Sequence, residues 1–192
     1  MAYKCGKIIS VLTPNIVSFI SLVLCLITCS ILFFNQMYCS FIVAAILWWF
    51  AAIFDAADGD LARYIGKSST FGGWLDSLFD RMKELLIFGV LGYVAYKNYS
   101  NELYLLLGFL SIFTNVMSGW ISDTKKLLIE KRDVEIKLSK KYCLGMVDTR
   151  DFIIIVSLLL HEIRLALFLY STLFLLVLLY QIILFYKRYA PR

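Results

Sequence analysis

Long runs of apolar residues alternate with short polar segments along almost the whole chain. A helix needs about 20 apolar residues to cross the hydrocarbon core of a bilayer. The pattern predicts transmembrane helices over about 15–34, 40–63, 72–97, 103–123, 151–168 and 168–187. The last boundary is the weakest, because the polar residues at 161–164 offer an alternative outer loop that would make both flanking helices short. We therefore expect an all-α integral membrane bundle of six transmembrane helices.

Composition supports this interpretation. Of the 192 residues, 61% are hydrophobic, and the mean hydropathy is +0.79. A soluble domain of this length would be nearer 45–50% apolar. We expect one transmembrane domain over residues 1–192, in a multi-pass protein of the cell membrane that has membrane lipid as its surroundings.

The basic residues are distributed unevenly between the two ends of the predicted helices. One side carries Lys4, Lys7, Arg63, Lys67, the basic loop 125–150, Lys187, Arg188 and Arg192; the other carries Lys97 and Arg164. Positive residues concentrate in cytoplasmic loops, so both termini are expected in the cytoplasm. The net charge of +5 follows from this topology signal, and we expect no nucleic-acid partner.

Five aspartates lie between residues 55 and 80, at the predicted cytoplasmic ends of the second and third helices. At 100° per residue, one stripe about 140° wide contains Asp55, Asp58, Gly59, Ala62 and Arg63, and leaves Asp60 outside. On the third helix, Gly72, Asp76 and Asp80 share a face. Because the connection is short, we expect these helices to be antiparallel neighbours whose four carboxylates converge.

Four converging carboxylates repel one another unless a cation lies among them. Carboxylate oxygens are ligands that suit magnesium, manganese or calcium rather than zinc or copper. Gly59 and Gly72 leave room for a bulky group, and Arg63 suits phosphate oxygens. The pattern favours a metal-bridged site for a pyrophosphate-bearing substrate, in which a carboxylate takes a proton from a hydroxyl. The single histidine, His161, is expected at the opposite membrane interface.

The residues spell D-x-x-D-G-x-x-A-R-x8-G-x-x-x-D-x-x-x-D, which resembles the signature of the CDP-alcohol phosphotransferase family. The resemblance implies transfer of a phosphate-linked group from a CDP-linked lipid donor to a second alcohol, with release of CMP, by a homodimer whose active site is at the cytoplasmic face. It implies two Mg²⁺ ions, with Mn²⁺ as an alternative, held by Asp55, Asp58 and Asp76. Asp80 would contribute to one ion and act as the general base.

The resemblance also implies which residues contact the donor. Gly59 and Arg63 would contact the CDP group, with Ser69 as a further candidate. The stretch LTPNIVS is similar to a T-P-N-x-V-[ST] element of the family, which adds Pro14, Asn15 and Ser18. The same stretch is also typical of a helix start, with Thr13 as N-cap and Pro14 in the first turn, and both interpretations can hold together.

The acceptor alcohol is the less defined substrate. The ending D-S-x-x-D-R at 76–81 resembles the inositol-phosphate branch of the family, although Tyr-Ala-Asp is usual next and this chain has Met-Lys-Glu. A phosphorylated acceptor needs cations, and the candidates are Arg81, Lys125, Lys126 and Arg150. Cytoplasmic loops are basic in any case. We expect a small phosphorylated polyol such as inositol phosphate, with glycerol phosphate, serine, ethanolamine and choline as alternatives.

Other interpretations explain less of the pattern. A magnesium-dependent membrane prenyltransferase also uses acids near a membrane face, but its motifs and longer chain do not match. A cation carrier would not need Gly59, Ala62 and Arg63 on the acidic stripe. Purely structural ion pairs with Arg63, Lys67, Arg81 and Lys83 would account for only one or two of the acids.

Overall fold

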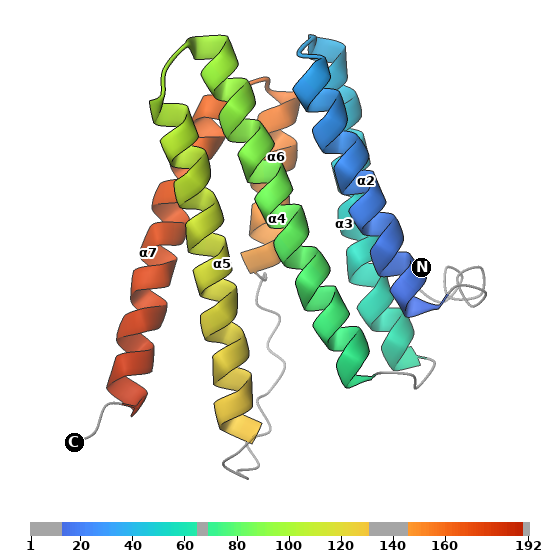
Figure 1. Ribbon diagram of the computed structural model, residues 1–192, viewed down its shortest axis with the longest axis vertical. Helices are drawn as coiled ribbons and strands as arrows, with labels where there is room; N and C mark the ends of the chain where they lie inside the picture. Colours follow the sequence, from blue (N-terminus) through green and yellow to red (C-terminus); the bar gives the residue numbers. More distant parts are fainter. Residues whose placement is uncertain (1–12, 65–68, 131–145, 190–192) are drawn as a thin grey trace.

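The computed structural model describes residues 13–64, 69–130 and 146–189, and all secondary structure within these ranges is helical (Figure 1). The helices are α2 (Pro14–Phe34), α3 (Tyr38–Tyr64), α4 (Thr70–Tyr99), α5 (Leu103–Glu130), α6 (Met146–Leu159) and α7 (Ile163–Tyr189). The prediction of an all-α bundle is confirmed for the described residues.

Helix α2 begins at the predicted residues, and α4 begins with a cap that was not predicted. Thr13 is the N-cap of α2 and Pro14 stands in its first turn, where the missing N–H of proline costs nothing. Ser69 is the N-cap of α4, and its hydroxyl oxygen accepts a hydrogen bond from the backbone N–H of Gly72 at 3.0 Å. Such a cap satisfies one of the unpaired donors of the first turn.

The predicted boundary between the last two helices at residue 168 is wrong. The chain turns at 160–162 instead, where His161 has a φ of 57°, and α7 then runs unbroken from Ile163 to Tyr189. Residues around 168 are continuously apolar and offer no reason to break a helix, whereas the polar residues at 161–164 do. The alternative loop was therefore correct, although only α6, with 14 residues, is short.

Four helices in the described ranges are long and apolar enough to cross a membrane, namely Asn15–Phe34, Tyr38–Gly59, Leu103–Ile121 and Ala166–Tyr186. Helix α4 is long enough, but its first half carries charged residues. Helix α6 has 14 residues, which at 1.5 Å per residue reach only about 21 Å of a core about 30 Å thick. Six spans and cytoplasmic termini therefore stay predictions.

Helix α2 is central to the packing around the acids. It packs along both α3 and α4, while α4 packs against α5, α5 against α7, and α3 against α6 (Figure 1). Helices α3 and α4 are antiparallel, but they make no extensive contact with each other. The expected antiparallel pair is present, and the two helices meet through Lys83 and the acids, whereas α2 packs along both of them.

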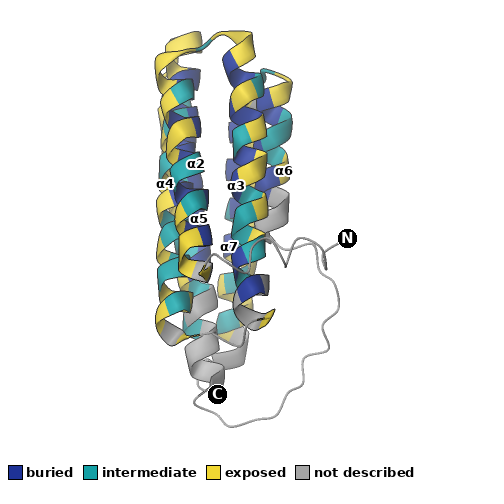
Figure 2. Cartoon of the chain, turned by 90° about the vertical axis from the view of Figure 1, so that its right-hand side faces the viewer, coloured by how far each residue is buried: buried dark blue, intermediate teal, exposed yellow. Residues whose placement is uncertain are grey.

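Large apolar side chains are exposed on much of the described surface, and several charged side chains are buried. Figure 2 shows the exposed and buried positions along the helices. Phe109 and Leu176 are both more than 60% exposed, whereas Lys83, Glu84 and Arg150 are each at most 5% exposed. This arrangement is expected for a protein surrounded by lipid, in which charged side chains face the bundle interior and pair with one another.

Two glycines allow α4 and α5 to cross closely. A Cβ on Gly92 would lie 3.2 Å from the Cα of Gly108, and a Cβ on Gly108 would lie 3.1 Å from the Cα of Gly92. Small residues at a crossing permit this close backbone approach in membrane helices. The crossing fixes α5 against the helix that carries Asp76 and Asp80.

Candidate active site

Three aspartates from two helices meet inside the bundle. Asp55 belongs to α3, and Asp76 and Asp80 lie one turn apart on α4. One carboxylate oxygen of each lies within 4.8 Å of the others, and all three side chains are partly exposed. The i, i+4 spacing places Asp76 and Asp80 on one face of α4, which is how two helices assemble a group of three acids.

The fourth predicted acid, Asp58, lies outside this group. Its side chain is buried, and it accepts a hydrogen bond from the hydroxyl of Ser18 on α2. Asp58 and Ser18 thus connect α3 to the start of α2. The predicted role of Asp58 as a metal ligand stays a prediction.

Lys83 is the cation that touches the acids. Its Nζ donates a hydrogen bond to Asp55 Oδ1, lies 2.9 Å from Asp80 Oδ1 and lies 3.4 Å from Ser21 Oγ. The side chain of Lys83 is only 5% exposed. The structural ion pairs considered from the sequence are therefore present for Asp55 and Asp80, although one ammonium does not balance three carboxylates.

The three-acid group fits a divalent cation by its chemistry. All of its donors are carboxylate oxygens, which suit Mg²⁺ or Mn²⁺. Several carboxylates this close repel one another, and Lys83 offsets only part of their charge. Asp55, Asp76 and Asp80 would hold such an ion.

Some of the residues predicted to contact the donor lie near the starts of α2 and α4. A Cβ on Gly72 would lie 3.1 Å from Ser69 Oγ and 3.6 Å from Asn15 Oδ1, so these three residues are neighbours. Pro14 starts α2. Gly59 directly follows Asp58 on α3. Arg63 also belongs to α3, but its side chain lies outside the described part of the structure.

A second buried cluster links α4 to α6. Glu84 accepts a hydrogen bond from Arg81 at 2.6 Å with one oxygen, and from Arg150 at 2.8 Å with the other. Arg150 Nε also donates to Asp151 at 3.0 Å, and Trp48 of α3 donates to the same carboxylate oxygen at 3.2 Å. Two of the predicted acceptor cations, Arg81 and Arg150, therefore meet at Glu84.

The other two predicted acceptor cations, Lys125 and Lys126, lie on α5, and their side chains are outside the described part of the structure.

His161 lies far from the acid cluster. Its ring lies 4.4 Å from that of Phe41, and Asp55 follows Phe41 by 14 residues of helix, which is about 21 Å. This agrees with its expected place at the opposite end.

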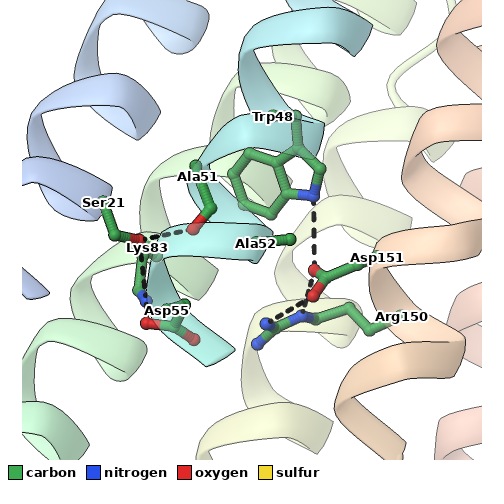
Figure 3. A pocket seen from close by; sticks show the side chains of 8 residues that line it. All are labelled: Ser21, Trp48, Ala51, Ala52, Asp55, Lys83, Arg150 and Asp151. Atoms are coloured by element: carbon green, nitrogen blue, oxygen red, sulfur yellow. Dashed lines mark hydrogen bonds and ion pairs between the residues drawn. The ribbon is translucent and has the colours of Figure 1, made fainter. Parts of the chain in front are cut away.

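A small pocket lies between the acid cluster and the second cluster (Figure 3). Its lining residues are Ser21, Trp48, Ala51, Ala52, Asp55, Lys83, Arg150 and Asp151. Lys83 projects towards Asp55 on one side, and Arg150 and Trp48 converge on Asp151 on the other. The pocket thus joins a predicted metal ligand to a predicted acceptor cation.

Sequence reasoning missed several members of these clusters. Lys83 was considered only as an ion-pair partner, and Glu84, Asp151, Trp48 and Ser21 were given no role in the site. The available signal was a charged residue within an otherwise apolar helix, which in membrane proteins faces the interior and has a function by default. Glu84 also follows Asp80 at the i, i+4 spacing of one helix face.

Comparisons with known proteins place the chain among its relatives. The family model described as CDP-alcohol phosphatidyltransferase matches residues 11–186. An archaetidylinositol phosphate synthase of Pyrococcus horikoshii is 39% identical over 90 residues, which are 45% of this chain and 46% of that protein. A bifunctional IPC transferase and DIPP synthase of Archaeoglobus fulgidus is 28% identical over 123 residues, which are 64% of this chain and 24% of that protein.

An uncharacterized protein of Aquifex aeolicus is 39% identical over 74 residues, which are 38% of this chain and 37% of that protein. The matched regions therefore span less than half the length of each of these relatives. The family match, in contrast, extends over most of the chain and includes both acidic helices. On this evidence, the chain belongs to the CDP-alcohol phosphatidyltransferase family.

Proposed function

We propose that this protein is a membrane transferase of lipid biosynthesis, which moves a phosphate-linked group from a CDP-alcohol lipid to an acceptor alcohol and releases CMP. The observation that carries the proposal is the meeting of Asp55, Asp76 and Asp80 inside a chain of this family. Neither a cation carrier nor a set of purely structural ion pairs would explain three converging acids together with membership of this family.

In the proposed site, Asp55, Asp58, Asp76 and Asp80 hold two divalent ions, Mg²⁺ first and Mn²⁺ as an alternative. When bound, the ions would neutralise the pyrophosphate and stabilise the leaving oxygen. The hard oxygen donors of the three-acid group support this assignment. Asp58 would join them by rotating away from Ser18, with which it is hydrogen-bonded in the structure.

Asp80 is proposed as the general base. Its carboxylate takes the proton of the acceptor hydroxyl, and that oxygen attacks the β-phosphorus of the donor. The new P–O bond forms as the bond to CMP breaks, and CMP leaves with the electron pair. Asp80 is partly exposed at the acid cluster, which supports access by a substrate hydroxyl.

Donor binding is proposed at the start of α2 and around the acids, through Pro14, Asn15, Ser18, Gly59, Arg63 and Ser69. The proximity of Asn15, Ser69 and Gly72 supports this placement. So does the hydrogen bond between Ser18 and Asp58, which connects the α2 motif with the acidic motif. The hydroxyl of Ser69 also has a structural role as the cap of α4.

The proposed acceptor is a small phosphorylated polyol such as inositol phosphate, bound by Arg81 and Arg150 with Lys125 and Lys126. The names of two relatives, an archaetidylinositol phosphate synthase and an IPC transferase, support an inositol phosphate. The position of Arg150 in the pocket beside Asp55 supports an acceptor next to the metal ligands. The same chemistry with glycerol phosphate or serine is the alternative.

We also infer that residues 1–192 form a single multi-pass domain in the cell membrane, with six spans, cytoplasmic termini and a cytoplasmic active site. An uninterrupted family match over 11–186 supports one domain. Helix α4 has 30 residues, or about 45 Å, and is long enough to span with its charges facing inward. A homodimer is proposed from the family resemblance alone.

The deciding experiment offers the detergent-solubilised protein one CDP-lipid with Mg²⁺ and a panel of acceptors, including inositol phosphate, glycerol phosphate and serine. Product mass identifies the acceptor, and CMP release measures turnover. We expect a product with inositol phosphate and none from Asp76→Asn. Absence of CMP release with every acceptor would contradict the transferase assignment, and product formation only with a prenyl diphosphate donor would favour the prenyltransferase instead.

A further inference from the structure

Lys83 has an unusual place for a lysine. It lies three residues after Asp80 on α4, and its ammonium points into the acid cluster rather than towards solvent. Its Nζ contacts one oxygen each of Asp55 and Asp80, from two different helices. The whole residue is 4% exposed, so its charge has little water to solvate it.

The other cations near the acids have different partners. Arg81 is paired with Glu84, and Arg150 is paired with Glu84 and Asp151. In the described part of the chain, Lys83 is therefore the cation in contact with the three-acid group. It offsets one negative charge and leaves the group with an excess.

Lys83 contacts two of the three carboxylates that a metal would use. Oxygens of Asp55 and Asp80 belong to the group that could hold a cation, and the ammonium lies against both carboxylates. An ammonium and a divalent ion bound to the same carboxylates repel each other, and poor solvation makes that repulsion strong. The lysine and the metal therefore compete for the same negative charge.

We propose that Lys83 is an internal counter-ion of the acid cluster, which holds Asp55 and Asp80 together in the metal-free protein and weakens binding of the divalent ion. The inference rests on the metal site of the proposed function and adds a positioning residue to it. Lys83 acts through Asp55 and Asp80 and needs no contact with substrate. Its loss has two opposite effects: the metal-free protein becomes less stable, and the metal binds more tightly.

The test measures Mn²⁺ binding to the full chain in detergent, by the electron paramagnetic resonance signal of free Mn²⁺, together with thermal unfolding. Lys83→Met removes the charge and keeps a long side chain, and Lys83→Gln is a second neutral variant should the first fail to fold. Lys83→Arg keeps the charge. Lys97→Met, at the exposed end of the same helix, is the matched control.

We expect the neutral variants to bind Mn²⁺ about tenfold more tightly or better, because the loss of one charge repulsion at short range is at least of that size. Their unfolding temperature should fall without metal and recover when Mn²⁺ is saturating. Lys83→Arg and Lys97→Met should bind Mn²⁺ as the wild type does. Unchanged or weaker Mn²⁺ binding by both neutral variants overturns the inference.

Asp76→Asn separates this result from the proposed function. If the wild type binds Mn²⁺ and Asp76→Asn does not, the metal site stands, and an unchanged affinity in the Lys83 variants overturns only the role of Lys83. If neither the wild type nor any variant binds Mn²⁺, the metal site and the counter-ion role are both contradicted.

Discussion

The guanidinium group of Arg81 lies directly against Gly119, so that a Cβ on this glycine would come within 2.1 Å of Arg81 Cζ. Arg81 also donates a hydrogen bond to the backbone oxygen of Asn115, one turn earlier on α5, at 3.3 Å. The absence of a side chain at Gly119 thus allows a residue of α4 to be held by α5. This contact positions one of the two arginines proposed for the acceptor.

Gly119→Ala should therefore displace Arg81. The end of an arginine side chain moves easily, so we expect stability to change by less than about 1 kcal/mol, below the usual cost of a rigid overpacked core. The KM for a phosphorylated acceptor should rise several-fold, while the KM for the CDP-lipid stays constant. Gly89→Ala is the matched control, because a Cβ there meets nothing within 4 Å. Equal acceptor KM values in both variants would argue against the role of Arg81.

Asp80→Asn should remove the proposed base and keep the shape of the side chain. Loss of general-base catalysis lowers the rate by about 10²–10⁴-fold. We expect turnover to fall within this range, while binding of the CDP-lipid, measured by calorimetry with Mg²⁺ present, changes little. Asp60→Asn, which helical phasing places off the acidic stripe, should have nearly normal turnover. Near-normal turnover by Asp80→Asn would show that another group is the base.

Ser18→Ala should destabilise the protein by leaving a buried carboxylate without its hydroxyl partner. Asp58 is 5% exposed and bonded to Ser18, and loss of a partner for a buried polar group costs about 1–3 kcal/mol. Thermal unfolding in detergent measures the effect. Ser30→Ala is the control, since that exposed hydroxyl bonds only to a carbonyl of its own helix. Equal unfolding temperatures for the two variants would contradict the importance of the Ser18 contact.

Glu84→Gln should be the most destabilising of these substitutions. It removes the charge that both Arg81 and Arg150 share; breaking a buried ion pair costs up to about 3–5 kcal/mol, and Asp151, which stays paired with Arg150, offsets part of this cost. We expect a large drop in unfolding temperature together with loss of acceptor binding. Glu162→Gln removes an ion pair with Arg164 at an exposed turn and should have little effect. A stable Glu84→Gln protein would mean that the arginines find other partners.

The sequence predicted the acidic residues more accurately than their surroundings. The positions of Asp55, Asp76 and Asp80 follow from a local rule, the angle between residues on a helix, and the structure brings these three together. The place of α2 depends on contacts between distant segments, and no local rule predicts that it packs against both α3 and α4. The same limit applies to Arg150, whose partner Glu84 is 66 residues away.

Two features of the fold have a local signal in the sequence. The polar residues at 161–164 indicate the loop where the structure has it, whereas the apolar run through 168 offers no reason for a break. The burial of Lys83 is indicated by its place in an otherwise apolar helix, whereas its contact with Asp55 on another helix has no local signal. Tertiary packing determined both outcomes: the unequal lengths of α6 and α7, and the burial of Lys83.

Helix α2 carries no acid, yet it is the helix that packs against both α3 and α4. A rotation or tilt of α2 would therefore act on both helices that carry the metal ligands, α3 with Asp55 and α4 with Asp76. An apolar substitution on α2 that alters only its packing can in this way tune the spacing of metal ligands on two other helices. Helix α2 thus connects the two halves of the acidic motif through packing, in addition to the ion pairs of Lys83.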